Sequence, residues 1–75
     1  MSQEYPTVFQ EAVNKKLAEA EQIIKAANPN VEVFKKLYIG DAVPKKGEPG
    51  KVTVIVFLTA HNVVQEPAPR IIESE

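Results

Sequence analysis

Two stretches of the chain, Val31–Ile39 and Lys51–Thr59, alternate apolar and polar side chains and constrain the fold more than any other feature. Alternation with a period of two is typical of β-strands that bury one face. The aliphatic residues stand at odd positions in the first stretch and at even positions in the second. This pattern predicts one shared aliphatic layer, interrupted only by Lys35 and made of Val31, Val33, Leu37, Ile39, Val52, Val54, Val56 and Leu58.

The segment between the two stretches, residues 40–50, is rich in glycine and proline. These residues end both strands and let the chain reverse its direction. We therefore expect the two strands to form an antiparallel hairpin with a long loop.

The opposite faces of the two strands mix aromatic and aliphatic residues with polar ones. Phe34 and Tyr38 lie on this face in the first strand, and Ile55 and Phe57 lie on it in the second. With only one helix to cover the sheet, this second face stays open, and an exposed apolar patch on a soluble protein usually marks an interaction site.

The N-terminal third predicts one amphipathic helix from Thr7 to about Ala27. Its apolar residues recur at steps of three and four, as one stripe of a helix requires: Phe9, Val13, Leu17, Ala20, Ile24 and Ala27. Thr7 and Gln10 fit a capping box at the start. Asn28 before Pro29 disfavours further helix, so we expect the helix to end there.

The C-terminal part gives weaker signals. Val63 and Val64 predict a short third strand, and the prolines of segment 66–70 predict an extended linker or a sheet edge. Ile71 and Ile72 are expected to dock on this molecule or on a second copy. The predicted fold is α+β, a two-layer sandwich of one helix on a two- or three-stranded antiparallel sheet. Residues 1–66 form the single domain, and residues 67–75 form an extended tail.

Composition limits the chemistry. A chain of 75 residues seldom gains more than about 3–5 kcal/mol from one core without a staple. It has no cysteine and one histidine, so disulfides and thiolate metal sites are excluded, and we expect no cofactor and no metal. Self-association, as a homodimer or larger, is the remaining common source of stability. The absence of a leader or long apolar span predicts a cytoplasmic protein without a membrane partner.

No group of residues predicts catalysis. The carboxylates are not set among apolar neighbours that would raise a pKa for acid–base work. His61 follows the second strand and is read as a turn or interface residue, and the sequence offers little material for a nucleophilic triad. We therefore expect a protein that is not an enzyme.

The preferred function is a protein-interaction or assembly module that self-associates through a sheet face or edge. Its predicted interface residues are Phe34, Tyr38, Ile55, Phe57, Ile71 and Ile72. The alternative is a single-stranded nucleic-acid binder, in which the aromatic face stacks on bases and lysines hold phosphates: Lys36, Lys45, Lys46 and Lys51. The net charge of −1 counts against this alternative. A flat ring-shaped ligand between two copies is a third option.

Overall fold

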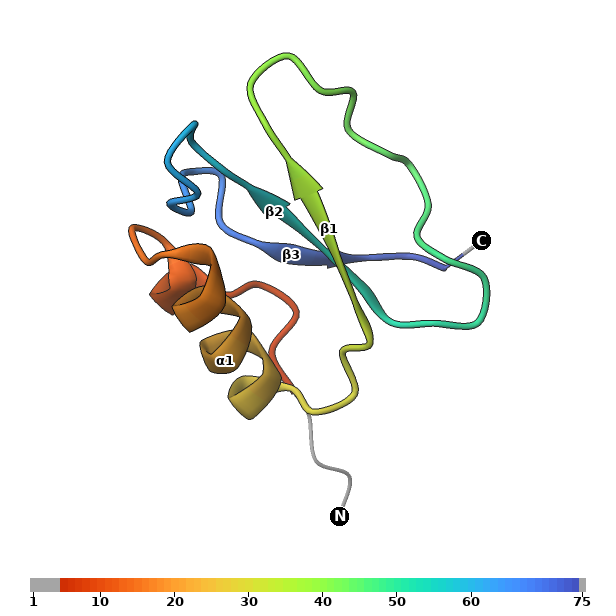
Figure 1. Ribbon diagram of the computed structural model, residues 1–75. Helices are drawn as coiled ribbons and strands as arrows, with labels where there is room; N and C mark the ends of the chain where they lie inside the picture. The colour runs from red at the N-terminus through yellow and green to blue at the C-terminus, as the bar shows by residue number, and fades with distance from the viewer. Residues whose placement is uncertain (1–4, 75) are drawn as a thin grey trace.

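The computed structural model describes residues 5–74 and contains one α-helix and one three-stranded sheet. The elements follow in the order η1 (Gln10–Ala12, a 3₁₀ helix), α1 (Leu17–Ala27), β1 (Val33–Leu37), β2 (Thr53–Phe57) and β3 (Arg70–Ile72). Helix α1 lies on one side of the sheet (Figure 1). The predicted α+β class, with a helix followed by strands, is confirmed.

The strand pairing differs from the predicted hairpin. The sheet has the order β1-β2-β3, in which β1 and β2 are parallel and β2 and β3 are antiparallel. Parallel neighbours need a connection of about a dozen residues or more, and residues 38–52 supply it. This segment runs from the end of β1 back to the start of β2 (Figure 1). The glycines and prolines therefore serve a long crossover rather than a reversal.

The parallel register also changes which residues share a face. Val33 pairs with Thr53 and Phe34 with Val54, so odd positions of β1 match odd positions of β2. The predicted layer matched odd positions with even ones and is wrong by one residue, which moves one strand's side chains to the other face. Phe34, Val54 and Ile71 pack into the helix-side core, whereas Val33, Thr53 and Ile72 occupy the opposite face.

The main core lies between α1 and the sheet. It consists of buried residues from positions 9–31 and 54–64: Phe9, Ala12, Ala20, Ile24, Val31, Val54, Val56, Leu58 and Val64. Leu37 and Ile55 are also buried but lie outside this cluster. Strand β2 is thus covered on both faces, which accounts for its nearly continuous apolar sequence.

The helix is shorter than predicted. It ends at Ala27 as expected but begins at Leu17, because Asn14 adopts a left-handed conformation with φ of 71° and interrupts the chain before it. The predicted Thr7–Gln10 cap is absent, since η1 has no side-chain cap. Phe9 nevertheless reaches the core, so the apolar spacing is satisfied without a continuous helix. None of the helices within residues 5–74 is long and apolar enough to cross a bilayer.

The third strand lies at Arg70–Ile72 rather than at the predicted Val63–Val64. Val63 and Val64 form isolated bridges with Lys16 and Leu58. Ile71 and Ile72 dock on this molecule, as one of the two predicted possibilities required, through pairing of β3 with β2. The domain boundary after residue 66 stays a prediction.

Candidate functional site

The loop of residues 38–52 is bounded by two tight turns. The amide of Asp41 donates to the carbonyl of Tyr38 at 3.0 Å, and the amide of Lys51 donates to the carbonyl of Glu48 at 3.2 Å. The third residue of each turn is a glycine with positive φ, +94° at Gly40 and +71° at Gly50. Glycine adopts this conformation without steric cost. The two turns therefore fix where the loop leaves β1 and where it enters β2.

The first half of the loop, residues 42–45, projects without support from hydrogen bonds. Within the described part of the chain, none of these four residues has a hydrogen-bond partner. Val43 is 47% exposed and Lys45 is exposed. Pro44 fixes its own φ and favours an extended conformation at Val43. The backbone groups of this half are thus free to pair with a strand of another protein, as in β-strand addition.

The second half of the loop, residues 46–51, is anchored to the sheet and to the segment after β3. The amide of Gly47 donates to the carbonyl of Glu73 at 2.7 Å, and the Lys46 ammonium lies 2.9 Å from Glu73 Oε2. The amide of Glu48 donates to Thr53 Oγ1 at 3.1 Å. Three consecutive residues of the loop are therefore tied to residues that belong to other parts of the fold.

Gly47 is required by close packing. A Cβ atom at this position would lie 2.5 Å from both Cβ and Oγ1 of Thr53, which is far inside van der Waals contact. Beneath the loop is a hollow of about 170 Å³, lined by Val33, Lys35, Pro44, Lys46, Gly47, Glu48, Pro49, Thr53 and Ile72. The second face of the sheet, predicted to be open, is here covered by the chain's own loop.

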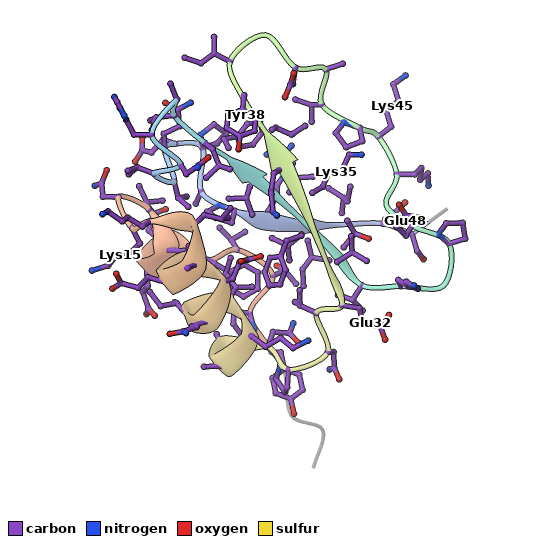
Figure 2. All side chains as sticks on the ribbon, in the orientation of Figure 1. Lys15, Glu32, Lys35, Tyr38, Lys45 and Glu48 are labelled. Atoms are coloured by element: carbon purple, nitrogen blue, oxygen red, sulfur yellow. The ribbon has the colours of Figure 1, made fainter. Side chains whose placement is uncertain are left out.

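The two neighbouring lysines in the middle of the loop have different surroundings. Lys45 points away from the body of the protein (Figure 2) and has no ion-pair partner among the described residues. Lys46 instead reaches Glu73. The hydrogen bond from Lys46, and then its charge, lower the pKa of Glu73 below its ordinary value of 4.5, so Glu73 is ionised at neutral pH. Of this pair, Lys45 is the cation offered to a partner.

The residues predicted as an interface do not form one surface: Phe34, Tyr38, Ile55, Phe57, Ile71 and Ile72. Ile55 is fully buried, and Phe34 and Ile71 pack against the helix-side core. Tyr38 is 42% exposed, and its hydroxyl donates to Asn62 Oδ1 at 2.7 Å. Ile72 lines the hollow below the loop. The set is divided between the two faces of the sheet because the register pairs Phe34 with Val54, and Ile55, the next residue, lies on the other face.

The lysines of the nucleic-acid alternative are also separated. Lys36 follows Lys35 in β1 and therefore lies on the opposite face of the strand from the hollow that Lys35 lines. Lys45 and Lys46 lie in the loop over that hollow, and Lys51 closes the second turn. His61 is exposed in a different turn, beyond β2, where its amide donates to Thr59 Oγ1 at 3.2 Å. No single basic surface results among the described residues.

The anchoring residues were not identified from the sequence. Glu73 lies 27 positions after Lys46, and Thr53 lies within the stretch predicted as the second strand. No local pattern predicts that a carboxylate near the end of the chain meets a lysine in the loop. The glycine at position 47 was the one usable signal, since a glycine outside a turn often marks a close approach of backbone.

Comparison of the chain with known proteins identifies the family to which it is similar. The model of the Potato inhibitor I family matches residues 4–71. Among solved structures, the crystal structure of bitter gourd trypsin inhibitor has a TM-score of 0.67 and 22% sequence identity, and the alignment covers 92% of this chain and 94% of that chain. At this identity the likeness shows a shared fold. None of the curated proteins compared with the chain matches it.

These findings correct the predicted function. The self-associating assembly module and the single-stranded nucleic-acid binder are both wrong, because the family points to a protease inhibitor. The expected protein partner is confirmed in general form, since an inhibitor of this kind acts on another protein, but a homodimer and a nucleic acid receive no support. An inhibitor is also consistent with the expectation of a non-catalytic protein. The chain belongs to the Potato inhibitor I family.

Proposed function

We propose that this protein inhibits a serine protease of trypsin-like specificity by inserting the first half of its 38–52 loop into the active-site cleft. The observation that carries the proposal is the exposed, unpaired Lys45 at the centre of a loop whose neighbouring residues are anchored. The specificity pocket of trypsin contains a buried aspartate, which selects a basic side chain. The structural neighbour is a trypsin inhibitor, which supports the same class of target.

Lys45 fits this role better than Lys46 because of the peptide bond that follows each residue. The amide after Lys46 belongs to Gly47, which donates to Glu73 and packs against Thr53. The amide after Lys45 belongs to Lys46 and has no hydrogen bond within residues 5–74. A protease that binds Lys45 meets a free peptide bond, whereas one that binds Lys46 must first detach the loop from the sheet.

The anchored second half supports inhibition over simple cleavage. A loop that is held in its binding conformation before association loses little conformational entropy when it binds. The bonds from Lys46, Gly47 and Glu48 hold the residues directly after Lys45 in this way. Affinity therefore rises while the loop stays fixed to the body of the inhibitor.

The test is a titration of trypsin activity with the purified protein and with Lys45→Met. Wild-type protein is expected to inhibit trypsin, and the variant is expected to lose at least about 30-fold in affinity, because removing one member of a buried charge pair costs about 2–5 kcal/mol. Lys36→Met is the matched control, since it removes an exposed lysine from β1 and should leave the inhibition constant unchanged.

Two results would contradict the proposal. One is a wild-type protein that leaves trypsin fully active at a large molar excess. The other is equal loss of inhibition in Lys45→Met and Lys36→Met. A gain-of-function variant adds a further check: Lys45→Phe should shift inhibition from trypsin to chymotrypsin, whose specificity pocket is hydrophobic.

A further inference from the structure

Two adjacent lysines pose a problem of register for the loop. Lys45 and Lys46 carry the same side chain, and a pocket that selects a basic residue by charge accepts either one. Binding through Lys46 would shift the whole loop by one residue in the protease cleft. Something in the protein has to favour one register, and the two lysines differ in what holds them.

Glu73 contacts the loop through both its side chain and its main chain. Its carboxylate holds the Lys46 ammonium at 2.9 Å, and its carbonyl accepts the Gly47 amide at 2.7 Å. The two contacts act on consecutive residues, and Gly47 also forms an isolated parallel bridge with Ser74. One residue next to β3 therefore holds the two consecutive loop residues directly after Lys45.

We propose that Glu73 is a positioning residue that selects Lys45 over Lys46 as the side chain presented to the protease. The inference rests on the proposed function. The Glu73 carboxylate pairs with the Lys46 ammonium and holds it toward the C-terminal segment. The Glu73 carbonyl accepts the Gly47 amide and holds the Lys46–Gly47 peptide bond away from the protease. Lys45, with no partner of its own, is left as the recognition residue.

Other charges near Lys46 do not replace Glu73. Glu48 lines the hollow below the loop but forms no ion pair with Lys46 in the described structure, and Lys35, which also lines it, carries the same charge as Lys46. The lowered pKa of Glu73 agrees with a pair that is intact at neutral pH. The pair is exposed, with side-chain accessibilities of 52% for Lys46 and 83% for Glu73, so its energetic effect is modest and salt-dependent.

The experiment maps cleavage sites by mass spectrometry during short incubations with trypsin. It compares the wild-type protein with Glu73→Gln, which keeps the shape and the backbone carbonyl but removes the charge, and with Glu73→Lys, which repels Lys46. The share of cleavage after Lys46 relative to cleavage after Lys45 should rise roughly two- to five-fold in Glu73→Gln, as expected for loss of an exposed pair. The rise should be larger in Glu73→Lys.

The matched control is Glu19→Gln, which breaks the other ion pair of the described structure, between Lys15 and Glu19 in the helix region. This variant should cleave like wild type. High salt should shift the wild-type ratio toward that of Glu73→Gln, and circular dichroism confirms that each variant is folded.

The outcomes separate this inference from the proposed function. If wild type fails to inhibit trypsin but the cleavage ratio responds to Glu73, the proposed function fails and the positioning role stands. If wild type inhibits trypsin and both Glu73 variants keep the wild-type ratio, the positioning role fails alone. If trypsin neither binds nor cleaves at either lysine, both the proposed function and the positioning role of Glu73 fail.

Discussion

The two halves of the 38–52 loop have opposite characters. Residues 42–45 make no hydrogen bond within the described chain, whereas residues 46–48 are each bonded to Thr53 or Glu73. The first half presents backbone groups without hydrogen bonds and the unpaired cation of Lys45. The second half fixes the position of these groups. A protein that must present an exposed segment in one conformation can therefore place the restraint beside the contact residues and leave those residues themselves unoccupied.

The largest expected effect comes from adding a methyl group to the anchored half. Gly47→Ala places a Cβ within 2.5 Å of Thr53, and overpacking of this kind costs about 1–3 kcal/mol. The anchored half should lift from the sheet and become as accessible as residues 42–45. Chemical denaturation measures the loss of stability, and limited proteolysis measures the increased accessibility of the anchored half. Ala42→Ser, a small change in the unsupported half, should leave both measurements unchanged; wild-type behaviour of Gly47→Ala would refute the packing argument.

Removal of the Thr53 hydroxyl tests a single bond of the anchor. Thr53→Val keeps the volume of this buried side chain but leaves the Glu48 amide without its acceptor. We expect a loss of about 1 kcal/mol in the free energy of unfolding and faster exchange of the Glu48 amide hydrogen. Unchanged exchange at Glu48 would show that this bond does not restrain the loop. Thr59→Val, in the turn beyond β2, provides a comparison outside the loop.

A smaller effect is expected where the loop leaves β1. The Asp41 carboxylate accepts the amide of Tyr38 at 2.8 Å in an exposed turn. Asp41→Ala should cost roughly 0.5–1 kcal/mol, and Asp41→Asn, which keeps an acceptor oxygen, should recover most of it. Thermal denaturation of the two variants measures the difference. Equal melting temperatures would mean that Gly40, rather than the carboxylate, sets this turn.

The smallest effect is the response of the anchored half to acid. The pKa of Glu73 is lowered in the folded protein, so its pairing with Lys46 contributes fully above pH 4.5 and is lost as the pH falls through the lowered value. An NMR titration of the Glu73 carboxyl group follows this loss. In Lys46→Met the titration midpoint should rise toward the ordinary value; the same midpoint in both proteins would exclude Lys46 as the cause.

The sequence predicted the parts of the fold that depend on local patterns. The apolar stripe located α1 from Leu17 onward, and the alternation located β1 and β2. The parallel pairing was missed because a segment rich in glycine and proline satisfies a reversal and a crossover equally well. The start of the helix was missed because Asn14, with φ of 71°, interrupts a stripe whose residues still reach the core.

The candidate site could be predicted only in part. Lys45 and Lys46 were identified as loop cations, but they were assigned to phosphate contacts because their charge alone does not distinguish an anion from an acidic pocket. Ile55 was assigned to a surface because the second face of the sheet was expected to stay open, whereas the folded chain covers this face and buries Ile55. The ion pair and hydrogen bond that Glu73 makes with the loop join distant parts of the chain, and composition and spacing do not reveal such contacts.

The parallel pairing of β1 and β2 also has a kinetic consequence. Helix α1 is built from neighbouring residues, whereas joining β1 to β2 requires closure of the intervening loop before any pairing energy is gained. In refolding experiments we expect helical signal to appear no later than protection of the β1 and β2 amides. The conformation that the loop presents is therefore expected to form together with the pairing of β1 and β2.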